Sequence, residues 1–285
     1  MKFSVFTVGT PEYDLEETLA KLQEFGYDGV EWRVNDFPKD EATLNSVPSY
    51  WGYNKSTVDV DTIEENAEQI KNLSDKYNLE ISALATYLSV SDPVKIEKVL
   101  KAAAIMDCHK IRVNVPKYDG TENYNVLFNK TIEEVRILEK LAEKYNVKIN
   151  LETHMWNIIP SASAAYRLVS NFNSKYIGII HDAGNMVHEG FEQYKFGFEL
   201  LGDYLDHVHI KNARWVEKGK NENGSSTFEA EWCPIKKGQV NFNILLADLK
   251  ATGYDGWLSF EDFSSEQTTD EKLKCSLEFI KGIIG

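Results

Sequence analysis

The segment VKINLETH (147–154) is an apolar, β-rich run that ends in ionisable side chains. Three later segments repeat this pattern, namely IGIIHDAGN (177–185), HVHIKN (207–212) and WLSFED (257–262). A charged side chain at the end of a buried strand is costly unless it is paired, hydrogen-bonded or bound to a metal. A buried ion pair explains one such end, but four in succession indicate a functional site where neighbouring strands end.

Four more β-rich runs precede these segments, and amphipathic stretches such as DLEETLAKLQEFG (14–26) separate the runs. The apolar residues of these stretches recur at three- and four-residue steps, which is the helical period. Asp61 and Asp92 are expected to begin two of the helices. The expected strands are Phe3–Val8, Gly29–Arg33, Glu80–Tyr87, Ile111–Val115, Val147–His154, Ile177–Asp182, His207–Lys211 and Trp257–Glu261.

Strands that alternate with helices predict a parallel sheet, and eight strands are the number that closes the common α/β barrel. The chain has 285 residues and no linker rich in Pro, Gly or Ser. We therefore expect residues 1–285 to form one domain, a single (β/α)8 TIM barrel. A doubly wound open sheet is the alternative, and it is disfavoured because no Gly-rich phosphate-binding turn follows the first strand.

Two connections are too long for a plain strand–helix unit, one from Asn35 to about Val60 and one from Ala213 to about Gly238. Both insertions follow strands, the second and the seventh, so they fall on the face where barrel enzymes keep their active sites. Their aromatic residues either fill small loop cores or wall a pocket for a sugar ring. These residues are Tyr50, Trp51, Tyr53, Trp215 and Trp232.

Composition excludes several classes of partner and of compartment. The net charge of −14 repels phosphodiester backbones and anionic membrane surfaces, so we expect neither nucleic acid nor membrane as a partner. No stretch approaches the roughly 18 apolar residues of a transmembrane helix, and the N-terminus lacks the pattern of a signal peptide. Cys108, Cys233 and Cys275 are odd in number and far apart, which predicts no disulfide framework. We expect a cytoplasmic protein.

The strand ends offer a set of metal ligands. Strands five to eight close one side of a barrel, so their terminal side chains converge across its mouth. Few cations are near enough to neutralise three carboxylates, and a divalent metal ion supplies the missing charge. One imidazole with three carboxylates suits Mn²⁺ best, with Mg²⁺, Co²⁺ and Zn²⁺ as alternatives. The expected ligands are Glu152, Asp182, His209 and Glu261.

The sequence resembles the xylose isomerase-like TIM barrel superfamily of sugar isomerases, epimerases and related dehydratases. The matching stretches span nearly the whole chain: FGYDGVEWR, INLETH, HDAGN, HVHIKN and KKGQVNFNILLADLKATGYDGWLSFED. The resemblance implies one divalent metal on the four ligands named above, and a substrate contact at Glu31. Many epimerases of the family carry a histidine three residues after the strand-six aspartate, where this sequence has Asn185. That departure leaves the fold intact but counts against a strict ketose-epimerase assignment.

Strand alternation extends the site, because side chains two residues apart share a face. His154 lies on the face of Glu152, and Lys211 lies on the face of His209. The predicted catalytic residues are Glu152, Glu261, His154 and Lys211, and the predicted substrate contacts are Glu31, Tyr87, Arg112 and Asn185. The remaining histidines are expected to be structural: His207 as a hydrogen-bonded core residue, His181 as a core residue, and His109 and His188 on the surface or in helices.

The predicted activity is that of a sugar or sugar-phosphate isomerase or epimerase. The metal would polarise a carbonyl and acidify the adjacent C–H, and Glu152 and Glu261 would move the proton through an enediolate. A dehydratase of a cyclic keto-polyol, of the 3-dehydroshikimate or inosose type, shares the deprotonation step and is the alternative. A DNA-repair endonuclease requires more histidines and a basic groove, and a non-catalytic sugar-binding barrel would not need a complete ligand set. We expect a small sugar or polyol as the partner; a homo-oligomer is compatible with the sequence.

Overall fold

Eight parallel strands form a closed barrel in the computed structural model, which describes residues 1–285. The strand order around the barrel is β1-β11-β8-β7-β6-β5-β4-β2, and the pairing of β2 with β1 closes it. The predicted (β/α)8 fold is confirmed. The barrel strands are β1 (Lys2–Phe6), β2 (Gly29–Asn35), β4 (Glu80–Ser89), β5 (Lys110–Asn114), β6 (Lys148–Glu152), β7 (Ile177–Asp182), β8 (Leu205–Ile210) and β11 (Trp257–Phe260).

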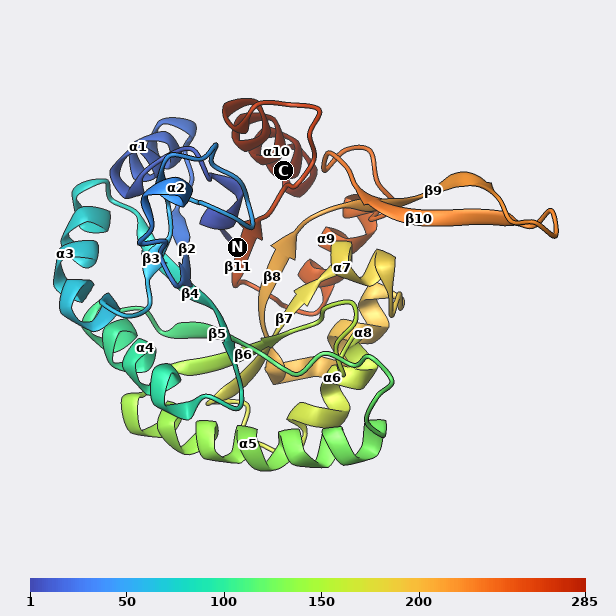
Figure 1. Ribbon diagram of the computed structural model, residues 1–285, viewed down its shortest axis with the longest axis horizontal. Helices are drawn as coiled ribbons and strands as arrows, with labels where there is room; N and C mark the ends of the chain where they lie inside the picture. Colours follow the sequence, from blue (N-terminus) through green and yellow to red (C-terminus); the bar gives the residue numbers. More distant parts are fainter.

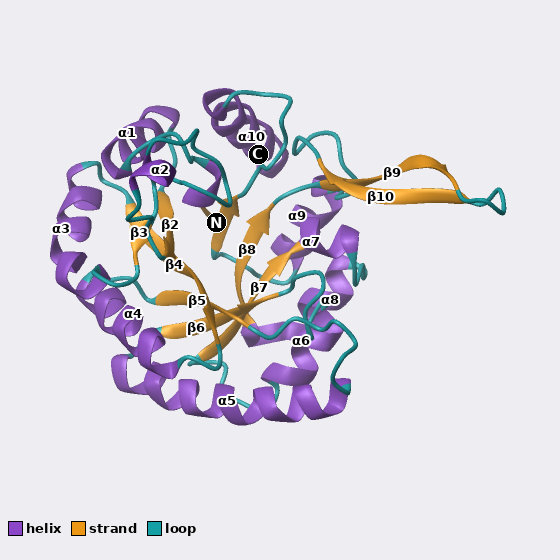
Figure 2. Ribbon diagram, viewed as in Figure 1, coloured by secondary structure: helices purple, strands orange, loops and turns teal.

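Helices surround the barrel and cover the outward faces of its strands (Figures 1 and 2). Sixty-one buried hydrophobic residues form one continuous core that includes the strands and the inner faces of the helices. The helices are α1 (Leu15–Phe25), α2 (Glu41–Leu44), α3 (Ile63–Lys76), α4 (Pro93–Ile105), α5 (Tyr124–Tyr145), α6 (Ala162–Val169), α7 (Ala183–His188), α8 (Tyr194–Leu201), α9 (Phe242–Ala251) and α10 (Thr269–Ile284). None of them combines the length and the apolar composition that crossing a bilayer requires.

Helix starts follow local capping chemistry. Asp92 caps α4 as expected, since its side chain accepts a hydrogen bond from the backbone N–H of Lys95 and Pro93 occupies the first turn. The start predicted at Asp61 is one residue early, because Thr62 is the N-cap of α3. Asp182 has two roles: it ends β7, and its Oδ1 caps α7 by accepting the Asn185 N–H at 2.8 Å. The second carboxylate oxygen, Oδ2, lies beside His209 and Lys211.

The two long connections differ in structure. The first contains α2 and the two-residue strand β3 (Val58–Asp59), which extends the sheet beside β2. The second is an antiparallel hairpin of β9 (Ala213–Lys220) and β10 (Ser226–Trp232), separate from the barrel sheet. Figure 1 shows this hairpin projecting from the barrel, with its base beside the carboxyl ends of β7 and β8.

Candidate active site

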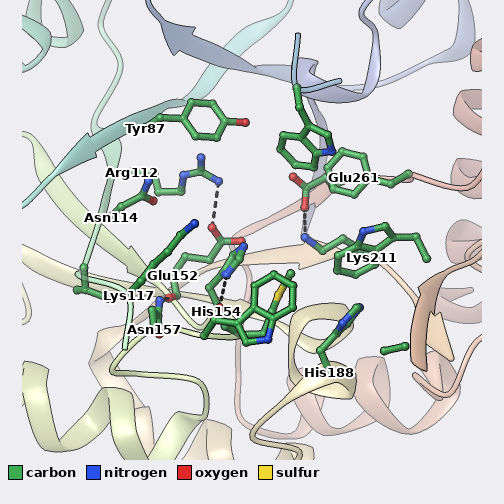
Figure 3. Close-up of a pocket in the computed structure, with 17 residues that line it drawn as sticks. Tyr87, Arg112, Asn114, Lys117, Glu152, His154, Asn157, His188, Lys211 and Glu261 are labelled. Carbon is green, nitrogen blue, oxygen red and sulfur yellow. Dashed lines mark hydrogen bonds and ion pairs between the residues drawn. The ribbon is translucent and has the colours of Figure 1, made fainter. Parts of the chain in front are cut away.

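A cavity of about 540 Å³ opens at the carboxyl ends of the barrel strands. Six of the predicted site residues line it, and they come from five different strands or strand ends: Tyr87, Arg112, Glu152, His154, Lys211 and Glu261 (Figure 3). The other four predicted site residues, Glu31, Asp182, Asn185 and His209, do not line the cavity and are fully buried beneath it. The barrel therefore brings together in space residues that lie far apart in the sequence.

Four ligand atoms gather at the base of the cavity. Single oxygens of Glu152, Asp182 and Glu261 and one nitrogen of His209 all lie within 4.8 Å of one another. The Nδ1 atom of His209 is 3.1 Å from Glu152 Oε1 and 3.4 Å from Asp182 Oδ2. We call these four residues the acidic cluster.

The acidic cluster is short of positive charge. Arg112 Nη1 donates to Glu152 Oε2 at 3.0 Å, and Lys211 Nζ lies 2.8 Å from Asp182 Oδ2 and also binds Glu261. These two cations face three carboxylates of the cluster and a fourth on Glu31. Burial alone would lower the pKa of His209, but the surrounding carboxylates raise it well above its usual range. Without a bound metal, the surrounding carboxylates therefore favour the protonated form of this imidazole.

The donor set fits a divalent metal ion. Three carboxylate oxygens and one imidazole nitrogen are the hard and borderline donors that Mn²⁺, Mg²⁺, Co²⁺ and Zn²⁺ accept. A metal bound at His209 Nδ1 would replace the proton that the carboxylates otherwise hold there. Burial raises the pKa of Glu261 and would also raise that of Glu152, but Arg112 and His209 hold the Glu152 pKa well below its usual value.

Glu31 reaches the cluster from the opposite side of the barrel. Its side chain is 0% exposed, and it binds His207 Nε2 at 3.0 Å and His209 Nε2 at 3.3 Å. A carboxylate can only accept, so His209 donates through Nε2, and Nδ1 is the nitrogen left for the cluster. In this position Glu31 holds a predicted ligand, and its predicted contact with substrate stays a prediction. The prediction of His207 as a hydrogen-bonded core residue is confirmed.

Asn185 also lies behind the cluster. Its Nδ2 donates to Glu152 Oε1 at 3.1 Å and to the Thr153 carbonyl at 3.2 Å, and it is fully buried. This hydrogen bond orients Glu152, and the predicted substrate contact at Asn185 stays a prediction. Gly184, one residue earlier in α7, packs so closely against Lys211 that a Cβ there would lie 2.8 Å from its backbone carbonyl carbon.

His154 presents one free nitrogen to the cavity. Its Nδ1 lies 2.8 Å from the Met155 carbonyl oxygen, which can only accept a hydrogen bond. The neutral ring therefore carries its proton on Nδ1 and leaves Nε2 as a base. Tyr87 has a buried hydroxyl with no protein partner, and its ring lies 4.9 Å from the Arg112 guanidinium. An unpartnered polar group in the wall of a cavity is suited to a ligand.

Several lining residues were missed by the sequence reasoning. Lys117, Trp156 and Asn157 belong to loops without periodic pattern, and Lys117 points into the cavity in Figure 3. His188 lines the cavity from the end of α7, one helical turn after Asn185. That three-residue spacing was a usable signal, because residues three apart share a helix face. Of the aromatic residues in the two insertions, Trp51 and Trp232 line the cavity, and Tyr50, Tyr53 and Trp215 do not.

Comparison with known proteins agrees with this architecture. A family model described as "Xylose isomerase-like TIM barrel" matches residues 19–283. An inosose dehydratase of Lactiplantibacillus plantarum is 27% identical over 131 residues, which are 43% of this chain and 42% of the dehydratase. The 3-keto-D-glucoside 4-epimerase YcjR of E. coli superposes with a TM-score of 0.72 at 18% identity, over 99% of each chain. The IolI protein, solved with a zinc atom, superposes with a TM-score of 0.73 at 16% identity, over 100% of this chain and 98% of IolI.

Proposed function

We propose that this chain, which belongs to the xylose isomerase-like TIM barrel family, is a divalent-metal-dependent isomerase or epimerase of a sugar or sugar phosphate. The family includes sugar epimerases and dehydratases among its solved structures and curated relatives. The observation that carries the proposal is that two bases line the same cavity: His154, whose Nε2 makes no hydrogen bond within the protein, and Glu261, which belongs to the acidic cluster. Such an arrangement suits proton transfer beside a carbonyl.

The metal would be held by Glu152, Asp182, His209 and Glu261, with Mn²⁺ as the first choice. When bound, it supplies Lewis acidity that polarises the substrate carbonyl and lowers the pKa of the adjacent C–H. The zinc in IolI keeps Zn²⁺ as an alternative. The three carboxylates favour a harder ion.

His154 and Glu261 have the freedom to move protons. Glu152 accepts hydrogen bonds on both oxygens, from Asn185 on Oε1 and from Arg112 on Oε2, so it is held as a ligand. His154 removes the proton next to the carbonyl through Nε2. Glu261 comes from another strand and returns a proton from a different direction, which is the requirement for epimerisation. This refines the predicted pair of Glu152 and Glu261.

The remaining polar groups bind and orient the substrate. The ammonium group of Lys211 and the hydroxyl of Tyr87 face the cavity and would stabilise the oxygen that gains charge in the enediolate. Arg112 also donates from Nη2 and Nε to the Thr86 carbonyl, at 3.1 and 3.3 Å. These hydrogen bonds fix the guanidinium group, so Arg112 positions Glu152 as well as lining the cavity.

Dehydration of a cyclic keto-polyol is the second candidate. The partial match to inosose dehydratase favours it. Asn185 also favours it, because many epimerases of the family have a histidine at this position, whereas Asn185 orients Glu152 and does not line the cavity. In that reaction His154 removes the same proton, and a hydroxyl leaves from the neighbouring carbon as water with a proton from Glu261. The two candidate reactions share the deprotonation and diverge in the step after it.

One experiment separates the candidates. The purified protein is incubated in D₂O with ketoses, ketose phosphates, inososes and 3-dehydroshikimate, and the products are followed by NMR. Solvent deuterium at carbon with the formula retained supports isomerisation or epimerisation, and loss of water supports the dehydratase. No change with any substrate argues against both.

A metal measurement tests the cluster separately. Metal content by mass spectrometry should fall in Glu152→Gln and in Asp182→Asn but not in Asp206→Asn. Asp206 is a matched control, because its partly buried carboxylate binds Lys110 and Lys148 at the amino-terminal ends of β5 and β6. Equal metal content in all four proteins would eliminate the proposed site.

A further inference from the structure

Five aromatic rings form a continuous wall along one side of the cavity. Successive ring centroids are 4.7 Å apart for Trp51 and Phe263, 5.7 Å for Phe263 and Trp232, 4.4 Å for Trp232 and His188, and 6.4 Å for His188 and Trp156. We call these five residues the aromatic arc. All five line the cavity. They come from five separate segments, so no single loop accounts for the arc.

The middle of the arc lies beside the acidic cluster, and both of its ends are exposed to solvent. Lys211, which binds Asp182 and Glu261, holds its ammonium group 4.9 Å from the Trp232 ring and 5.3 Å from the Phe263 ring. The two terminal tryptophans are far more exposed, Trp51 at 60% and Trp156 at 59%. A large apolar surface left open at the rim of a cavity indicates a binding site.

Trp156 is held in an unfavourable backbone conformation. Its φ of +64° lies in the left-handed region, which costs a bulky side chain about 1 kcal/mol or more. Two hydrogen bonds keep it there: its N–H donates to Glu189 at 2.8 Å, and its carbonyl accepts from the Tyr118 N–H at 2.8 Å. The indole ring thus lies at the cavity in a strained backbone conformation, and its burial is too small to compensate for that strain.

The size of the cavity exceeds the needs of one sugar ring. Its volume of about 540 Å³ lies in the range of roughly 300–1,000 Å³ that is common for drug-sized ligands. A ring that reacts between His154 and Glu261 covers the inner part of the arc near Lys211. The two ends of the arc, at Trp51 and at Trp156, stay uncovered. Aromatic faces bind the apolar faces of sugar rings and of other aromatic rings by burial and dispersion.

We propose that the aromatic arc is a subsite for a second ring, so that the substrate is a sugar or cyclitol that carries an aryl group or a further sugar. This inference rests on the proposed function, because the reacting ring must occupy the acidic cluster for the second ring to reach the arc. It deepens that function by excluding a free monosaccharide as the preferred substrate.

Calorimetric titration of the full-length protein tests the subsite. The ligands are matched pairs of methyl and phenyl β-glycosides with glucose, galactose and xylose heads, together with glucose and cellobiose. In at least one series, the phenyl glycoside should bind about tenfold more tightly than the methyl glycoside. Cellobiose against glucose decides whether a sugar serves as the second ring as well as an aryl group.

Variants locate the effect on the arc. At least one of the end variants Trp156→Gly and Trp51→Ala should bring the ratio of phenyl to methyl affinity close to one, because a single second ring stacks on one end of the arc. An unchanged ratio in both variants overturns the subsite. Phe196→Ala is the matched control, because this aromatic ring on α8 is exposed and lies outside the cavity. Trp156→Gly should not lower the melting temperature, because glycine adopts φ +64° without strain. A loss of affinity at unchanged melting temperature separates binding from a merely structural role.

The failures of the two proposals are distinguishable. Equal affinities within each pair, or no binding by any ligand, overturns the second-ring subsite. Deuterium exchange into a keto sugar reports on the proposed function alone. A ring-dependent affinity without any exchange or dehydration would leave the subsite standing and remove the proposed reaction.

Discussion

Replacing Glu31 by glutamine should weaken metal binding, although Glu31 is not one of the four proposed metal ligands. Glu31 holds His207 and His209 through charge-assisted hydrogen bonds at 3.0 and 3.3 Å in a fully buried environment. Glutamine keeps the shape but offers one acceptor oxygen and one NH₂ group. The two histidines then compete for the single acceptor oxygen, which weakens the hydrogen bond that keeps His209 Nδ1 directed at the cluster.

Two estimates of the magnitude agree. A hydrogen bond to a charged group contributes about 1.5–3 kcal/mol, and mutation of the partners that orient metal ligands costs about 10- to 100-fold in affinity. A factor of ten corresponds to about 1.4 kcal/mol, so this range is about 1.4–2.7 kcal/mol. We expect the dissociation constant for Mn²⁺ or Zn²⁺ to rise 10- to 100-fold in Glu31→Gln.

Competition with a metal-chelating dye measures that constant independently of any substrate. Wild type, Glu31→Gln and the control Asp206→Asn are compared at one pH, with unfolding curves to correct for folded fraction. The control removes a partly buried carboxylate at the other end of the strands and should leave metal affinity unchanged. An affinity of Glu31→Gln within threefold of wild type would refute the role of Glu31. A second metal per chain would instead make Glu31, His207 and His209 ligands themselves.

Three further predictions concern stability, catalysis and packing. Burial would raise the pKa of Asp206, but Lys110 and Lys148 lower it to about 2. The ionised carboxylate therefore stabilises the folded protein above the unfolded pKa of about 3.9, and this contribution is lost as the pH falls towards 2. Urea unfolding of Asp206→Asn should therefore show about 2 kcal/mol less stability at pH 7 and a shallower loss below pH 4; parallel curves would contradict this. His154→Ala should reduce the rate of deuterium exchange by about 10²- to 10⁴-fold at unchanged metal content, and concurrent loss of metal would show that the ring is structural. Gly184→Ala should displace Lys211 and lower activity, because the added Cβ clashes with Lys211. Denaturant titration should show a loss of about 1–3 kcal/mol in the free energy of unfolding. A gain in stability, from the higher helix propensity of alanine, would show that there is no clash.

The barrel and the grouping of the acidic cluster were predictable from local patterns. Apolar runs of strand length, helical periodicity between them and the count of eight are properties of neighbouring residues, so a single sequence contains them. Parallel strands of a barrel all end at the same face. A carboxylate that terminates a buried strand, as Glu152 and Asp182 do, is therefore expected near its counterparts before any coordinates are known.

The placement of residues behind and around the cluster required the tertiary structure. Glu31 meets His209 across the barrel interior, although 178 positions separate them in the chain, and the sequence contains no signal for that distance. Asn185 and His188 lie one turn apart on α7. Asn185 is buried and hydrogen-bonds to Glu152, whereas His188, at the end of the helix, lines the cavity.

The sequence by itself determined the barrel and the grouping of four candidate ligands at its strand ends, because strand and helix periods and strand ends are local features. Only the tertiary structure decided which polar residues face the cavity and which support the ligands. It also decided that Trp51 and Trp156, from loops without a regular period, complete one aromatic wall. The physical reason is that loop paths and contacts across the barrel depend on how distant segments pack against one another. No single stretch of the chain determines that packing.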